Sequence, residues 1–221
     1  MELPARDSEL VQIVDASLAD AARRAGPLLA CRIGCTQCCH GAFAINALDA
    51  ERLRTGMSAL RAAQPVLAVA IERRAYAWLG QYGSEFPGNT HTGILGTSDA
   101  DRARFDDFAN DAPCPALDPE TGRCDVYAWR PMTCRVFGPP IRATGDDGSE
   151  GLGHCELCFI GATPAQIAAC EMPVPLELEA DLLEEMKCNG GEMRCNSGEM
   201  ERDGRESGSS SETVVAFALV L

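Results

Sequence analysis

Cysteine is the residue that most constrains how this chain can fold. Twelve cysteines occur in 221 residues, a content typical of disulfide-rich secreted domains or of metal-binding proteins. The first residues, MELPARDSEL, are acidic, whereas a secretory signal would be basic and then apolar. We therefore expect a cytoplasmic protein with reduced cysteines, in which clustered thiols bind metal more readily than they form disulfides.

Charge and hydropathy narrow the possible partners. The formal net charge is -14, and an acidic field of this size repels phosphate backbones and anionic lipid surfaces. The longest apolar stretch is the C-terminal VVAFALVL, far shorter than the roughly 20 residues that span a bilayer. We therefore expect metal as the partner, with no nucleic acid and no membrane.

Periodicity predicts a mainly α fold with a small cysteine-rich β or loop region, built as a metal-stabilised single domain. Helical patterns occupy residues 7–26, 48–80, 98–111 and 176–187, with breaks expected near Gly56 and Pro65. Asp7 or Ser8, Ser98 and Thr163 are expected to cap helices. The turn DPETG lies between two short strand-like runs and predicts a hairpin.

The predicted domain covers residues 1–187, with its core at 31–170. Residues 188–212 turn to Gly, Ser, Glu and Asn, which predicts a flexible acidic segment. Residues 213–221 are apolar and β-branched and are expected to return as a buried C-terminal strand. Cys188 and Cys195 fall in the flexible segment, where we expect free exposed thiols rather than ligands.

The stretch CRIGCTQCCH, residues 31–40, holds four cysteines and a histidine. A helix would place the four cysteines on one face, and a turn at Gly34 would wrap amides around the sulfurs; both remain open. The neighbours Cys38 and Cys39 should diverge, which predicts more than one metal atom, or one metal and a reactive or supporting thiol. The spacing matches neither the ferredoxin run nor a zinc finger.

The segments CRIGCTQCCHGAF and PCPALDPETGRCDVYAWRPMTCRVFGPP resemble the YkgJ-type cysteine-cluster family (CxxCxxCC), over residues 31–140 and more loosely to 170. The resemblance implies a zinc- or iron-chelating domain, often regarded as an iron–sulfur protein. It departs from the family pattern at Cys31, which lies one residue farther from Cys35 than the family's first gap. A similar cluster occurs in flagellin lysine methylases. The ligands implied by the resemblance are Cys35, Cys38, Cys39, Cys114, Cys124 and Cys134, with Cys31 added.

A further C-x2-C sequence, HCELC, is followed by Cys170. We expect Cys155, Cys158 and Cys170 to bind metal, since the strand-to-helix setting of a redox pair is missing. His40 is either a ligand or a hydrogen-bond donor to sulfur, His154 is expected to be a neighbour of the site, and His91 to be solvated. Arg130 and Arg135 either offset thiolate charge or pair with surface carboxylates.

These features predict a protein that holds an iron–sulfur cluster, or zinc or iron ions, through thiolates. One alternative is a cluster-dependent enzyme, either an oxidoreductase or a methyltransferase related to the flagellin methylases. No glycine-rich turn suited to S-adenosylmethionine and no hydrolytic motif is visible. The other alternative is a structural or adaptor protein stapled by zinc.

Overall fold

The computed structural model describes residues 2–144, 148–189 and 212–221. Its first helix, α1 (Asp7–Ala25), buries Leu10 and Val14 and ends at Gly26, whose φ is +51°. The helix follows Arg6, and no side chain caps it. The predicted helix is confirmed, whereas the predicted cap at Asp7 or Ser8 is wrong because Asp7 turns instead to a buried partner, Arg52.

Two long helices follow, α2 (Ala47–Ala63) and α3 (Pro65–Tyr82). They meet at Gln64, as expected from Pro65, but the predicted break at Gly56 is wrong because α2 continues through it. A Cβ atom on Gly56 would lie 2.5 Å from Cγ of Trp129. The glycine therefore lets Trp129 pack against the helix backbone. Val66, in the first turn of α3, is 84% exposed.

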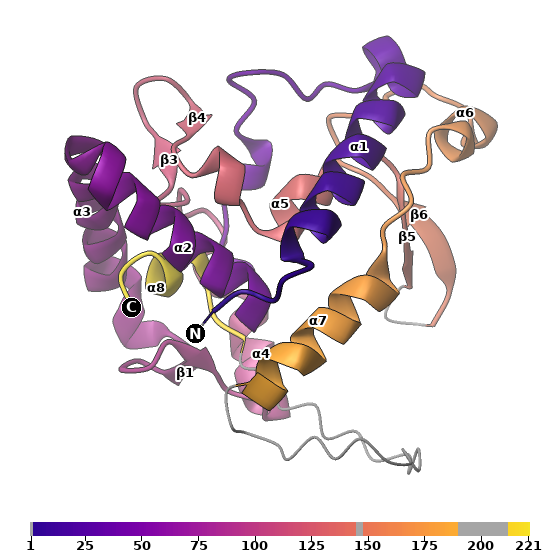
Figure 1. Cartoon of the computed structure of the whole chain (residues 1–221). Coiled ribbons are helices and arrows are strands. Elements are labelled where there is room, and N and C mark those ends of the chain that lie inside the picture. The colour runs from indigo at the N-terminus through magenta and orange to yellow at the C-terminus, as the bar shows by residue number, and fades with distance from the viewer. Residues whose placement is uncertain (1, 145–147, 190–211) are drawn as a thin grey trace.

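The C-terminal residues pack against α2 and α3 (Figure 1, yellow). They form one short bridge, between Ile45 and Thr213, and then the short helix α8 (Val215–Ala218). The predicted strand over residues 213–221 is therefore wrong, because a short buried apolar run suits a helix as well as a strand. The predicted flexible segment falls mostly on residues 190–211, outside the described residues, and its first two residues belong to a helix.

The remaining elements are four helices, of which α7 is the longest, and three pairs of short strands among the described residues. The helices are α4 (Asp99–Asp106), α5 (Met132–Val136), α6 (Pro164–Ala169) and α7 (Leu176–Asn189). Antiparallel pairs join β1 (Gly88–Asn89) to β2 (Ile94–Leu95), β3 (Leu117–Asp118) to β4 (Arg123–Cys124), and β5 (Ile141–Thr144) to β6 (Glu150–Gly153). Ser98 and Thr163 cap α4 and α6 as predicted. The mainly α fold with a small cysteine-rich β and loop region is confirmed.

The core forms between α2, α3 and α8 on one side and between α1 and α7 on the other (Figure 1). A buried ion pair joins these regions to the cysteine-bearing loops. Arg52 donates from Nε to Asp7 at 2.7 Å and from Nη1 to Asp49 at 2.5 Å, and Asp49 accepts the backbone N–H of Met132 at 2.9 Å. This network fixes the start of α5, which carries Cys134.

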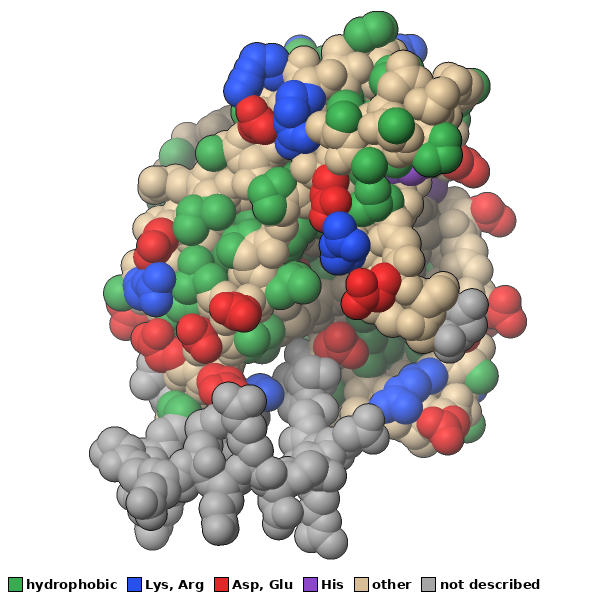
Figure 2. Space-filling view, turned by 90° about the vertical axis from the view of Figure 1, so that its right-hand side faces the viewer, with side chains coloured by type: hydrophobic (Ala, Val, Ile, Leu, Met, Phe, Trp, Pro, Cys, Tyr) green, Lys and Arg blue, Asp and Glu red, His purple; other side chains and the backbone are tan. Residues whose placement is uncertain are grey.

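The surface agrees with the acidic composition. Figure 2 shows acidic side chains spread over the side of the molecule that lies on the right in Figure 1, with basic and apolar side chains between them. The predicted lack of nucleic-acid binding stays a prediction. In the described ranges, no helix has the length and apolar character needed to cross a bilayer.

Candidate metal centre

The stretch 31–40 is folded as a turn. Gly34 has φ +88°, Cys35 donates its N–H to the carbonyl of Arg32 at 2.9 Å, and a single 3-10 turn covers Gln37–Cys39. Of the two predicted conformations, the turn at Gly34 is the one observed. The positive φ explains the glycine, since a side chain there would be strained.

Backbone pairing brings the end of this stretch to residues 112–114. Cys114 donates its N–H to the carbonyl of Cys39 at 2.7 Å, Gly41 donates to Ala112 at 2.9 Å, and His40 forms a β-bridge with Pro113. The adjacent thiols Cys38 and Cys39 therefore lie beside Cys114, although more than 70 residues separate them in sequence.

The other two cysteines of this region come from the elements that follow. Cys124 lies on β4 opposite Leu117 of β3, in a hairpin closed by Gly122 at φ +66°. Cys134 lies on α5, which leaves the hairpin through Arg130 and Pro131. We call Cys38, Cys39, Cys114, Cys124 and Cys134 the central thiol group.

The two adjacent thiols behave as a pair. Their sulfurs are 4.0 Å apart. A hydrogen bond from Cys39 lowers the pKa of Cys38 to about 6, helped by the charge of Arg130 and opposed by burial. The same hydrogen bond, followed by burial and the charges of Cys38, Cys114 and Cys124, raises the pKa of Cys39. The first proton of the pair thus leaves easily and the second is retained.

This distance corrects the expectation that neighbouring thiols diverge. Four sulfurs held about 2.3 Å from a tetrahedral zinc lie roughly 3.8 Å from one another. The 4.0 Å separation of Cys38 and Cys39 is therefore compatible with both thiols binding one metal atom.

Burial dominates the other three thiols. It raises the pKa of Cys114 to about 12 and raises the pKa values of Cys124 and Cys134. Backbone N–H groups oppose the rise, those of Ala116 and Leu117 at Cys114 and that of Val126 at Cys124. Such N–H groups support a thiolate ligand. The charges of Cys38, Cys114 and Cys124 each act on Cys134.

Arg130 lies beside this group and is 6% exposed. Its charge lowers the pKa values of Cys38 and Cys124, and its side chain stacks on Tyr127 at 3.9 Å and approaches Asp15 at 3.3 Å. Arg135, 1% exposed, binds Asp15 at 2.8 Å and the carbonyl of Ala128 at 2.5 Å. Arg130 therefore both offsets thiolate charge and pairs with a carboxylate, whereas Arg135 pairs with the same carboxylate. No local sequence pattern indicates Asp15 as the partner that the two arginines share.

Cys31 and Cys35 do not join the central thiol group. The charges that raise the pKa of Cys31 come from Cys158, Cys35 and Cys155, and those of Cys158 and Cys35 act on Cys155. We call Cys31, Cys35, Cys155 and Cys158 the knuckle thiol group. Cys170 is packed with Cys155 and Cys158 in an apolar cluster. The turn over residues 31–39 therefore divides its four thiols between two groups.

The three histidines differ in their surroundings. His40 and His91 are exposed, and Nδ1 of His154 lies 3.0 Å from the carbonyl oxygen of Cys155, the position of a neighbour. Cys188 is disulfide-bonded, so the predicted free thiol is wrong there, and Cys195 lies outside the described residues. The sequence reasoning did not identify Gly138, where an added Cβ atom would lie 2.7 Å from Sγ of Cys31. The signal at this position is a glycine directly before two prolines.

The thiols lie near one another, but not near enough to coordinate a shared metal ion. Among residues 2–144, 148–189 and 212–221, no three His, Cys, Asp or Glu side chains form a group compact enough to hold a metal ion as placed. Metal binding therefore requires the thiols to turn inward. The donor set itself fits zinc and iron, since both bind soft anionic thiolates.

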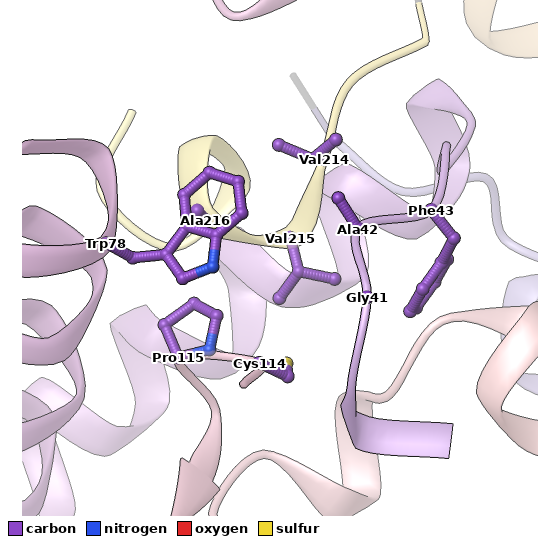
Figure 3. A pocket seen from close by; sticks show the side chains of 9 residues that line it. All are labelled: Gly41, Ala42, Phe43, Trp78, Cys114, Pro115, Val214, Val215 and Ala216. Carbon is purple, nitrogen blue, oxygen red and sulfur yellow. The ribbon is translucent and has the colours of Figure 1, made fainter. Parts of the chain in front are cut away.

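A small apolar cavity lies behind Cys114 (Figure 3). It has a volume of about 20 Å³ and is lined by Gly41, Ala42, Phe43, Trp78, Cys114, Pro115 and Val214–Ala216. Organic ligands usually occupy cavities of roughly 300 Å³ or more. This cavity is thus too small for an organic substrate beside the central thiol group.

The fold and the thiols define a class, a mainly helical domain whose cysteine-rich loops suit metal binding. The model of the family described as "CxxCxxCC: Putative zinc- or iron-chelating domain" matches residues 30–147. This is more than half of the chain, which therefore belongs to that family, and the resemblance seen in the sequence is confirmed. No curated protein and no solved structure is significantly similar to the chain. The family match supports metal binding in general.

Proposed function

We propose that the protein binds zinc or iron through the thiolates of the central thiol group. The observation that carries the proposal is the approach of five thiols from three separate segments, which the backbone pairing of Cys114 with Cys39 and of Cys124 with Leu117 brings together. Backbone N–H groups at Cys114 and Cys124 are placed to support thiolates. The charges of Cys38, Cys114 and Cys124 raise the pKa of Cys39 and also the pKa of Cys134. These three thiols form the common part of the group, and Cys39 or Cys134 supplies the fourth donor.

The chain's own residues would prepare these donors for metal. Arg130 and the amides favour the thiolate form and offset its charge, and the low pKa of Cys38 provides the first thiolate. The remaining thiols lose their protons to solvent as they bind, so affinity rises with pH. The bound metal would stabilise the loops against unfolding, as structural zinc does in small domains.

The 4.0 Å separation of Cys38 and Cys39 favours a single tetrahedral metal ion. The iron–sulfur cluster expected from the sequence is the alternative, and one observation favours it: the group has five thiols, one more than a tetrahedron uses. The enzymatic alternatives have no comparable support from the cavity behind Cys114.

Metal analysis of the full chain, purified without oxygen, tests the proposal. We expect zinc or iron bound with the wild-type chain, and loss of metal in Cys124→Ser. Cys170→Ser is the matched control, because Cys170 is also buried but lies outside the central thiol group. A colourless zinc protein supports the single ion, whereas brown colour with acid-labile sulfide supports the cluster. A wild-type chain that takes up no metal contradicts the proposal.

A further inference from the structure

The knuckle thiol group is held together by hydrogen bonds between distant segments. Phe159 donates its N–H to the carbonyl of Leu28 at 2.7 Å, and the N–H of Ala30 points to Sγ of Cys158 at 3.4 Å. Gln37 reaches Glu156 at 2.7 Å. These contacts place the turn with Cys31 and Cys35 beside the C-x2-C sequence.

The C-x2-C sequence itself has the shape of a metal-binding knuckle. Cys158 donates its N–H to the carbonyl of Cys155 at 2.9 Å, and the N–H of Leu157 interacts with the thiol of Cys155. Phe159 follows at φ +58°, a conformation that L residues avoid. Its side chain is buried, which holds the strained backbone in place. Strain of this kind is concentrated at functional sites.

The thiols of this group act on one another. Although the residue Cys31 as a whole is exposed, partial burial of its thiol is the largest cause that raises its pKa to about 12, followed by the charge of Cys158 and a hydrogen bond with it, and then by the charges of Cys35 and Cys155. Burial also raises the pKa of Cys155, and Cys158 adds a charge and a hydrogen bond. Cys158 is therefore the thiol shared between Cys31 and Cys155.

Gly138 lies between two members of the group. Its carbonyl accepts the N–H of Cys155 at 3.2 Å. A Cβ atom on Gly138 would lie 2.7 Å from Sγ of Cys31, closer than carbon and sulfur can approach. Only glycine allows the sulfur of Cys31 to approach the backbone that holds Cys155.

We propose that Cys31, Cys35, Cys155 and Cys158 bind a second metal ion, zinc or iron, separate from that of the central thiol group. Four thiolates complete a tetrahedron, and their protons pass to solvent on binding. Cys155 and Cys158 lie beyond residues 30–147, so the family match does not assign them. Cys170 packs against the group, and we infer that it does not bind. The proposal rests on the thiolate chemistry of the proposed function and adds a site to it.

Cobalt(II) titration of the reduced full chain tests this proposal, because tetrahedral cobalt thiolates have intense visible bands. We expect two equivalents for the wild-type chain and one for the double variant Cys155→Ser, Cys158→Ser. The reciprocal variant Cys114→Ser, Cys124→Ser should retain the other equivalent. Cys170→Ser is the matched control and should keep both. Circular dichroism shows whether each variant folds. If the double variant does not fold, Cys31→Ser repeats the test, because Cys31 lies at the exposed end of the group.

The outcomes separate the two proposals. One equivalent in the wild-type chain, unaffected by Cys155→Ser, Cys158→Ser or by Cys31→Ser, overturns the second site and leaves the proposed function standing. Loss of both equivalents in either double variant, with folding retained, shows one shared site and also overturns it. No cobalt binding at all contradicts the proposed function and the second site together.

Discussion

Gly138→Ala should separate the two consequences of the close contact at the knuckle thiol group. Gly138 has φ +123°, and an alanine there would carry a backbone strain of about 1–3 kcal/mol. Its Cβ would also lie 2.7 Å from Sγ of Cys31, roughly 1 Å inside ordinary contact. Cys31 is exposed, so its side chain can turn away. The overlap should therefore affect the position of the sulfur more than the stability of the fold.

We expect Gly138→Ala to weaken the second metal site by about 10–100-fold, the range for residues that orient metal ligands. Gly161→Ala is the matched control, because Gly161 has φ +74° and a Cβ atom added to it would have no other atom within 4 Å. It should lose about 1–2 kcal/mol of stability and keep its metal affinity. Urea unfolding measures the first quantity, and zinc competition with a chromophoric chelator measures the second. Equal zinc affinities in the two variants would refute the reasoning.

Three further variants test the supporting structure. Gly56→Ala should lose about 1–3 kcal/mol in urea unfolding because its Cβ overlaps Trp129, whereas Gly80→Ala, with open space around it, should gain about 0.5–1 kcal/mol; equal stabilities would contradict the contact. Arg130→Gln should raise the pKa values of Cys38 and Cys124, since the arginine charge lowers both, and should move the midpoint of metal binding to higher pH; Arg142→Gln, on an exposed side chain, should leave it unchanged. Arg135→Leu removes a buried donor to Asp15 and Ala128 and should cost about 3 kcal/mol; a loss below about 0.5 kcal/mol, the level of a surface change, would show that these contacts contribute little.

Local signals in the sequence predicted the elements around the site. The turn DPETG indicated the β3–β4 hairpin, and Ser98 and Thr163 indicated two helix caps, because each depends on hydrogen bonds within a few residues. The motif around Cys35, Cys38 and Cys39 pointed to the family that the comparison confirms. Features that depend on residues close together in sequence could therefore be predicted.

Contacts between residues far apart in sequence could not be predicted in the same way. Gly56 stays helical because Trp129 packs on it, and the C-terminal residues form α8 because α2 and α3 bury them. The division of the cysteines depends on the bridge from His40 to Pro113 and on the hydrogen bond from Phe159 to Leu28. Spacing along the chain contains no information on either pairing.

The two thiol groups share one short linker, which has a physical consequence for metal binding. Only Thr36 and Gln37 separate Cys35 of the knuckle thiol group from Cys38 of the central thiol group. Gln37 contacts Glu156 beside the knuckle, and Gly122 of the β3–β4 turn lies against Gly34 and Thr36. Fixing a residue costs about 1–2 kcal/mol of conformational entropy. A metal bound at one group would already order this linker, so the second metal should bind more tightly than it would to the other group alone. The short spacing within CRIGCTQCCH thus joins two sites that would otherwise bind independently.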